Sequence, residues 1–424
     1  MYKRITAIVC VVLIPMMMFG QNAAIRATWF VDGAKTEFEN RSHTALESME
    51  QGTSVVYATN GVELILTKLR MNKTSGSVVN DDRKETGRNS ALLADGGSNV
   101  IVEYCDVTSH SSQADGITAN GEGTKVTLQE GTVTTNKSAS AGIDAMHGAK
   151  VTVHKTEVNT SGNQSPAFYT LDGGDIVATE AFGLTAGQAS PSFHSSGMIL
   201  GTKCRMTSAK WTIGNVEDGQ LVLNKSELNA GGICGFLLYS TGSNDVQSQL
   251  DLTGNTISVA EGPLFFVTNN NNAQITVKGN KISCKSDDLM HVKADDWGVK
   301  GSNGGHATLL VNKQSLSGNI FVDSISSLQV NLNKGAKLNG QINDKENRCA
   351  QVHVKVGAGS SWTSKGESYL TSIVFDQPLA KGLKQLKGKH TIYYDPADPA
   401  NAPLEGKEYK TGGGKLCPLK LRYL

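Results

Sequence analysis

The sequence has few aromatic residues and few prolines: Phe, Trp and Tyr together make up 6% of the 424 residues, and there are only 9 prolines. A core must therefore be built mainly from aliphatic side chains. Neither sign of charge dominates, because 40 Lys and Arg residues face 39 Asp and Glu residues, so nucleic acid is not an expected partner. The seven cysteines are widely spaced and include no C-x-x-C pair, so no metal site of that type is expected.

Catalytic and cofactor-binding patterns are missing from the sequence as well. The histidines are scattered, and none can be placed in a Ser-His-Asp or Cys-His arrangement. The glycine runs are not phosphate-binding loops, since they fall at the turns of a repeat described below. The sequence therefore predicts no cofactor and no bound metal.

Long apolar runs are confined to the first twenty residues. Lys3 and Arg4 precede an almost unbroken apolar run at residues 5–19, which is too short to span a bilayer and is typical of a secretory signal peptide. We expect residues 1–20 to be removed after Gly20, and residues 21–62 to form an N-terminal segment or cap. Because no later run approaches the ~20 apolar residues of a membrane helix, we expect a secreted or surface-held protein without a transmembrane helix.

What the sequence has in abundance is Gly, Ser, Thr and Asn arranged around a repeat of short apolar strands. The segments KVTLQEGTVTT (residues 125–135) and KVTVHKTEVNT (residues 150–160) place apolar side chains at the same three positions. The alternation within each segment has a period of two, which indicates strands with one buried face. The three positions are occupied in successive segments by Val100, Val102 and Val107; Val126, Leu128 and Val133; Val151, Val153 and Val158; Leu221, Leu223 and Leu228; Leu250, Leu252 and Ile257; Ile275, Val277 and Ile282; and Leu309, Val311 and Leu316.

A fourth apolar position follows the third by ten residues, and we expect its occupants to form one further column. They are Ile117, Ile143, Phe168, Leu238, Val267 and Val292. Repeats of about 22–29 residues that contain two or three strands stack into a parallel β-solenoid. Parallel crossover connections favour the right hand.

The predicted fold is therefore all-β: a single-stranded right-handed parallel β-helix of about twelve turns over residues 63–375. Beyond residue 375 the repeat stops, and residues 376–424 are expected to form a small C-terminal cap. Such a cap is needed because an open last turn presents unpaired strand edges.

Two insertions interrupt the repeat and are the places where binding is expected. The first, residues 80–89 (NDDRKETGRN), carries Arg83 and Arg88, and the second, residues 293–306, carries Trp297. Insertions in a coil form loops on its outside, and a tryptophan in a polar loop has little core to fill. Trp297 is therefore the best candidate for stacking on a sugar.

Asp115 is a further candidate, because it occupies a position that is otherwise apolar. By the spacing of the repeat its equivalents are Ala141, Pro166, Phe236, Phe265 and Met290. A carboxylate in such a position must be hydrogen-bonded or lie at the edge of the coil. Two interpretations stay open at this point: a cap of an early turn, or part of a binding site.

Several segments resemble a family of secreted bacterial β-helix proteins usually described as adhesin-like. They include the region from residue 98 to residue 179, EGPLFFVTN (residues 261–269), DWGVKGSNGGHATL (residues 296–309), VDSISSLQVNL (residues 322–332) and GSSWTSKGESYLTSI (residues 359–373), in the same order over nearly the whole mature chain. The resemblance implies a pectin-lyase-like β-helix at the bacterial surface or in the medium. It also implies an extracellular glycan or a host or matrix protein as partner, and it brings no catalytic residues with it.

A polysaccharide hydrolase or lyase on the same scaffold is the alternative. The rung ITVKGNKISCKSDDLMHVK (residues 275–293) is similar to the polygalacturonase rung with paired aspartates, which would make Asp287, Asp288 and His306 the catalytic set. Two carboxylates can divide the roles of acid and base in glycoside hydrolysis. The Asn-Thr-Asp motif and the Arg-x-Lys clamp of that family are missing here, so the sequence favours a non-enzymatic protein.

Overall fold

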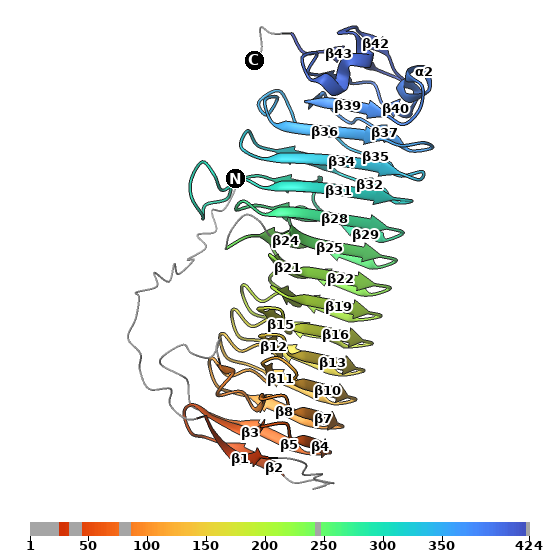
Figure 1. Cartoon of the computed structure of the whole chain (residues 1–424). Coiled ribbons are helices and arrows are strands. Elements are labelled where there is room, and N and C mark those ends of the chain that lie inside the picture. The colour runs from red at the N-terminus through yellow and green to blue at the C-terminus, as the bar shows by residue number, and fades with distance from the viewer. Residues whose placement is uncertain (1–24, 34–44, 76–85, 242–246, 421–424) are drawn as a thin grey trace.

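The chain forms a right-handed parallel β-helix of about 15 turns that ends in a small cap (Figure 1). The computed structural model describes residues 25–33, 45–75, 86–241 and 247–420. The predicted signal peptide and Arg83 lie outside these residues. Among the residues described, none of the helices has the length and apolar character needed to span a bilayer.

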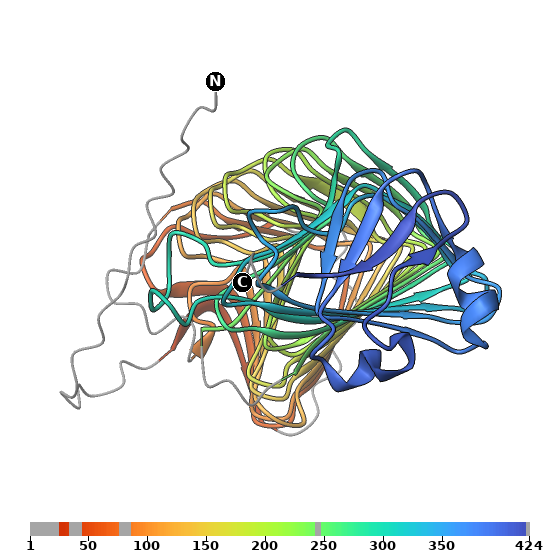
Figure 2. The same cartoon turned by 90° about the horizontal axis from the view of Figure 1, so that it is seen from above.

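Each regular turn contributes one strand to each of three parallel sheets, in the order sheet A, sheet C, sheet B. A view along the coil axis superimposes the successive turns and shows the three faces of the coil (Figure 2). Sheet A contains β1 (Arg26–Asp32), β3 (Thr53–Thr59), β6 (Leu92–Ala94), β9 (Ile117–Asn120), β12 (Ile143–Met146), β15 (Phe168–Leu171), β18 (Phe193–Ser195), β21 (Gly214–Glu217), β24 (Phe236–Tyr239), β27 (Phe265–Val267), β30 (Asp288–Val292) and β33 (Asn319–Val322).

Sheet C is the longest and runs through almost the whole coil. Its thirteen strands are β4 (Glu63–Thr67), β7 (Asn99–Glu103), β10 (Lys125–Gln129), β13 (Lys150–His154), β16 (Asp175–Thr179), β19 (Met198–Thr202), β22 (Gln220–Asn224), β25 (Gln247–Thr253), β28 (Asn272–Lys278), β31 (His306–Asn312), β34 (Ser327–Asn333), β36 (Gln351–Val356) and β39 (Ser372–Phe375). Its first strand begins at residue 63 and its last ends at residue 375, whereas sheets A and B begin earlier, at residues 26 and 45.

The third side of the coil is shared by two shorter sheets. Sheet B contains β2 (Ala45–Ser48), β5 (Arg70–Lys73), β8 (Asp106–Ser109), β11 (Thr132–Thr135), β14 (Glu157–Thr160), β17 (Phe182–Thr185), β20 (Arg205–Ser208), β23 (Glu227–Ala230), β26 (Thr256–Val259) and β29 (Lys281–Cys284). Sheet D then contains β32 (Ser315–Ser317), β35 (Lys337–Asn339), β37 (Ser361–Thr363) and β40 (Leu386–Lys387). β29 and β32 belong to different sheets, so the strand ladder on this side is interrupted once.

The predicted strand frame is confirmed by the register. Lys125 lies between Asn99 and Lys150 in sheet C, so the apolar positions that follow them stack directly on one another. The inward side chains of these strands are buried and form one continuous, largely aliphatic core. Four phenylalanines add two stacked pairs to this core: Phe168 on Phe193 and Phe236 on Phe265.

The prediction that the fourth apolar position forms a single column is wrong for the later turns. Phe168 stacks on Phe193, Gly214 and Phe236, so Leu238 lies two residues further along its strand than Phe168 does. The connection from sheet B to sheet A causes this offset. The chain advances ten residues from Val133 to Ile143 but only eight from Leu228 to Phe236. By the same register the later equivalents of Asp115 are not Phe236, Phe265 and Met290.

Side-chain hydrogen bonds run along the inside of the corner between sheets C and B. Asn255 accepts from the backbone N–H of Ser226 at 2.9 Å, and Asn280 accepts from that of Asn255 at 2.9 Å. Gln314 continues the series, because its Nε2 donates to the carbonyl of Asn280 at 3.0 Å. This corner ladder (Ser226, Asn255, Asn280 and Gln314) satisfies backbone groups that the bend of the chain leaves without strand partners.

A second ladder fills the corner between sheets B and A in the N-terminal half. Ser165 accepts from the N–H of Ser140 at 3.1 Å, and Ser190 accepts from the N–H of Ser165 at 3.0 Å. A threonine hydroxyl closes each of these turns, as when Thr135 donates to the carbonyl of Ser140 at 2.7 Å. Short polar side chains that bond to nearby backbone favour turns of this kind.

The C-terminal cap closes the last turns. It consists of sheet E, with β38 (Ser368–Leu370), β41 (Thr391–Tyr394), β42 (Tyr409–Lys410) and β43 (Lys415–Pro418), and of α2 (Leu379–Gly382), η1 (Leu383–Gln385) and η2 (Pro399–Leu404). Asn401 in η2 accepts from the N–H of Ile373 at 3.0 Å and donates to the carbonyl of Thr371 at 2.8 Å. Trp362 is fully buried next to Leu386 and donates to the carbonyl of Gly340 at 2.9 Å.

Candidate functional site

The outer face of sheet A carries a line of aromatic and histidine side chains that is interrupted in the middle by the buried Asn215 and Leu237. Alternate residues of each strand point outward, and the parallel register stacks one such residue per turn. The line, called here the aromatic column, comprises Tyr169, His194, Asn215, Leu237, Phe266, His291 and Phe321. Its six steps of ~4.8 Å give a length of roughly 29 Å along the coil.

Glu217 joins the N-terminal half of the column. Its carboxylate accepts a hydrogen bond from Nε2 of His194 at 2.9 Å and another from the hydroxyl of Tyr239 at 3.1 Å. The hydroxyl of Thr241 donates to the other oxygen. The ring of His194 also lies against Tyr169, with centroids 4.9 Å apart in an edge-to-face arrangement.

These bonds keep Glu217 ionised. Burial alone raises the pKa of its carboxyl, but the hydrogen bonds from His194 and its neighbours outweigh burial and lower that pKa to about 2. A carboxyl that is ionised at neutral pH and already engaged by three donors is poorly suited to act as a general acid. Its role in this geometry is to hold three side chains from neighbouring turns in fixed positions.

Trp297 reaches this cluster from the insertion between β30 and β31. Its half-buried ring lies edge-to-face against Tyr239, with centroids 5.2 Å apart, and its indole N–H donates to Asp295 at 3.3 Å. Asn303 fixes the loop, because its Nδ2 donates to the carbonyls of Asp295 and Trp297, both at 2.8 Å. The N–H of Asn269 donates in turn to the carbonyl of Asn303 at 3.0 Å. The insertion is thus bonded to the preceding turn, and it presents Trp297 beside the aromatic column.

The C-terminal half of the column is centred on His291. Its ring lies edge-to-face against Phe266 and Phe321, with centroids 6.2 and 5.9 Å away. The ammonium of Lys293 lies 5.8 Å from the centre of the Phe266 ring, within range of a cation–π interaction. Burial lowers the pKa of the His291 imidazole, and the opposing effect of the Asp288 carboxylate, 3.0 Å from Nε2, does not reverse the shift.

The three residues of the alternative catalytic set have different surroundings. Asp287 is exposed, Asp288 bonds to His291, and Nδ1 of His306 lies 2.9 Å from the hydroxyl of Ser327. Asp288 begins β30, whereas His306 begins β31, beyond the far end of β30.

The remaining sequence candidates lie far from Trp297. Asp115 is fully buried and accepts from the N–H of Ala141 at 2.6 Å and from the hydroxyl of Thr118 at 3.4 Å. Arg88 is half-buried next to β6, seven strands of sheet A before β27. Neither residue therefore belongs to the aromatic column.

The sequence did not point to Tyr169, His194, Glu217 or Tyr239. A signal was present for two of them, since Tyr169 follows Ser-Pro-Ala-Phe and His194 follows Ser-Pro-Ser-Phe. Aligning these two segments would have stacked the two rings. Glu217 and Tyr239 follow no such repeated segment.

In the described part of the chain, no group of three or more His, Cys, Asp or Glu side chains is arranged to hold a metal ion. Comparison with known sequences does not assign the chain to a family. No protein-family model matches the chain. No curated protein matches it either.

Proposed function

We propose that the protein is an exported, non-enzymatic, adhesin-like β-helix that binds an extracellular glycan through the aromatic column of sheet A. The observation that supports this proposal is the position of Trp297 on Tyr239, beside an outward line of rings. Aromatic faces give apolar contact to the C–H surfaces of sugars, while polar groups between them fix orientation. A column of roughly 29 Å suits an extended chain better than a single small molecule.

The charges beside the column favour binding over cleavage. Glu217 is engaged by three donors and Asp288 by His291, so neither carboxylate is placed as a proton donor with a partner carboxylate opposite. Hydrolysis needs such a pair across the bond to be cut. The cleavage alternative remains an outcome of the experiment below.

The test is binding of the mature chain to a glycan array, followed by calorimetric titration with the best oligosaccharide. Trp297→Ala is expected to weaken binding about tenfold, because losing one ring contact costs about 1 kcal/mol or more. Val299→Ala is the matched control: Val299 lies in the same insertion and is 75% exposed, so its removal should leave the affinity unchanged.

Three results would contradict the proposal. The first is an array on which no glycan binds, and the second is an equal loss of affinity in the two variants. The third is release of reducing ends or unsaturated products from the bound polysaccharide, which would favour the enzyme. Binding to a matrix protein instead of a glycan would support the adhesin-like role but would show that the ligand is not a glycan.

A further inference from the structure

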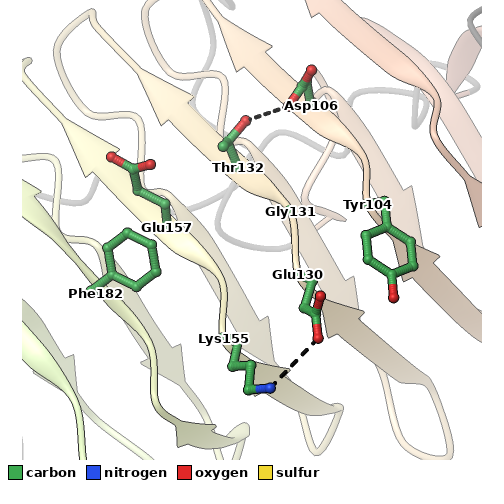
Figure 3. A pocket seen from close by; sticks show the side chains of 8 residues that line it. All are labelled: Tyr104, Asp106, Glu130, Gly131, Thr132, Lys155, Glu157 and Phe182. Carbon is green, nitrogen blue, oxygen red and sulfur yellow. Dashed lines mark hydrogen bonds and ion pairs between the residues drawn. The ribbon is translucent and has the colours of Figure 1, made fainter.

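A hollow of about 400 Å³ lies at the outside of the corner between sheets C and B, away from the aromatic column (Figure 3). It is open and elongated along the coil. One row of side chains comes from the corner itself, including Glu130 and Lys155, and the other comes from the first positions of sheet B strands, including Thr132 and Glu157.

Gly131 lies at the middle of this corner hollow. A Cβ added at this position would lie 2.5 Å from the carbonyl oxygen of Cys105, so no other residue fits without a backbone shift. The equivalent residues above and below, Cys105 and Thr156, point into the coil and are buried. The middle of the hollow is therefore backbone and short side chains.

Two exposed aromatic rings stand at the ends of the hollow. Tyr104 is 47% exposed at one end, and Phe182 is 39% exposed at the other. The two residues belong to turns three apart, which places them roughly 14 Å from one another along the axis. This length accommodates two or three pyranose rings, and large exposed rings at a hollow are typical of ligand contact rather than of core packing.

The charge between the rings is mainly negative. Three carboxylates, those of Asp106, Glu130 and Glu157, face one ammonium, that of Lys155. Lys155 lies 3.7 Å from Glu130 and is partly neutralised by it. Asp106 accepts from Thr132 at 2.8 Å. Arg70 lies 3.9 Å from Asp106 and offsets its charge, so Glu157 is the carboxylate of the hollow that has no ion pair within the described residues. Its charge would repel uronates and sulfated sugars and attract an ammonium group.

We propose that the corner hollow is a second binding site, for a linear oligosaccharide of amino sugars. Its terminal rings stack on Tyr104 and Phe182, and its ammonium groups pair with Glu157 and its neighbours. An extended basic peptide fits less well. Strands β8, β11, β14 and β17 are each paired on both edges, so a peptide cannot add a strand here.

The experiment is titration of the mature chain with a glucosamine trimer, an N-acetylglucosamine trimer and a galacturonate trimer. The glucosamine trimer should bind at least tenfold more tightly than the N-acetylated one, and the galacturonate trimer should not bind. Phe182→Ala should weaken binding of the glucosamine trimer about fivefold to tenfold. Leu184→Ala is the matched control, since Leu184 lies on the same strand, is 42% exposed and does not line the hollow.

Trilysine peptide distinguishes amino-sugar recognition from simple charge attraction. Equal affinity for trilysine and the glucosamine trimer would overturn the proposal, and so would an unchanged affinity in Phe182→Ala. Trp297→Ala is expected to leave this binding intact, because the column and the hollow lie on different faces. Failure of the proposed function and failure of this second site are therefore separate results.

Discussion

Glu217 shows how a single residue can organise a surface that spans several turns. Its carboxylate accepts hydrogen bonds from His194 in the turn before and from Tyr239 in the turn after. The ring of Tyr239 in turn packs edge-to-face against Trp297. Hydrogen bonds to a charged acceptor in a partly buried position are stronger than neutral ones. The orientation of the N-terminal half of the aromatic column thus depends on one ionised group.

We predict that Glu217→Gln destabilises the fold in a pH-dependent way. The pKa of Glu217 is lowered from 4.5 to about 2, so its contribution is fully present above about pH 4.5 and is lost as the pH falls towards 2. The shift corresponds to about 3 kcal/mol. Denaturant unfolding at pH 7, 4 and 2.5 should show a large difference between wild type and variant at pH 7, and a shrinking one below pH 4.5.

Glu227→Gln provides the control for this series. Glu227 pairs with Arg205 at 3.5 Å, and both side chains are largely exposed, so the pair should contribute little at any pH. A pH-independent difference for Glu217→Gln would contradict the assigned role of its charge.

At the residue scale the sequence singled out Trp297 as a candidate but did not predict the residues around it. Trp297 was recognisable because a large ring in a polar insertion has no local reason to be there. Tyr239 lies 58 residues earlier and contacts Trp297 only because the coil brings those turns together. The buried state of Asp115 follows similarly from a neighbour, Ala141, in the next turn.

Among the structural elements, the corner ladder supports the bend out of sheet C in four successive turns. Asn280 bonds to the preceding turn at two points, because it accepts from the N–H of Asn255 and donates to the carbonyl of Leu252 at 2.9 Å. Both backbone groups are inside the coil, where water cannot replace a lost partner.

Asn280→Ala should therefore lower the free energy of unfolding by about 3 kcal/mol, since a buried unsatisfied group costs about 1–3 kcal/mol. Chemical denaturation followed by circular dichroism measures the change. Asn229→Ala is the comparison: Asn229 is an outward residue of β23 that donates to Thr207 at 3.3 Å, and it should cost a few tenths of a kcal/mol. Similar losses in both variants would argue against a special role for the ladder.

The strands were predictable for a simple reason: the two-residue period and the spacing of the three apolar positions both report which side chains are inside. The turns between sheets B and A were not, because their length changes by two residues between the earlier and later turns without changing the strands. That change moved Phe236, rather than Leu238, into line with Phe168.

On the scale of the whole molecule, the C-terminal cap separates the coil from solvent. The side chain of Asn401 forms hydrogen bonds with the backbone of Ile373 and Thr371 at the edge of β39. β40 pairs with β37 and places Leu386 next to the buried Trp362. Without the cap, the edges of β37 and β39 and the ring of Trp362 would face water. Exposed edges of this kind pair with other chains.

A chain that ends after Phe375 is therefore expected to form oligomers or aggregates at concentrations where the full mature chain is monodisperse. Size-exclusion chromatography with light scattering tests this. A chain that ends after residue 420 retains sheets D and E and should behave as the full chain does. A monomeric, cooperatively folding chain ending at Phe375 would show that the cap is dispensable.

The overall architecture could be predicted because the same pattern of apolar residues recurs in successive turns, and such a repeat defines a parallel coil. The aromatic column and the corner hollow could not, since each is made of outward residues that do not repeat. Tyr104 and Phe182 illustrate the difference, because the equivalent residues of the following turns are Glu130 and Arg205.

The change from sheet B to sheet D has a mechanical consequence. In the turns before β29, neighbouring turns are joined by backbone ladders on all three sides, whereas between the turns of β29 and β32 only sheets A and C continue. A pull along the axis passes through every junction in series, so this junction carries the same force on fewer backbone bonds. The side-chain bonds between Asn280 and Gln314 cross it on the third side and share that load.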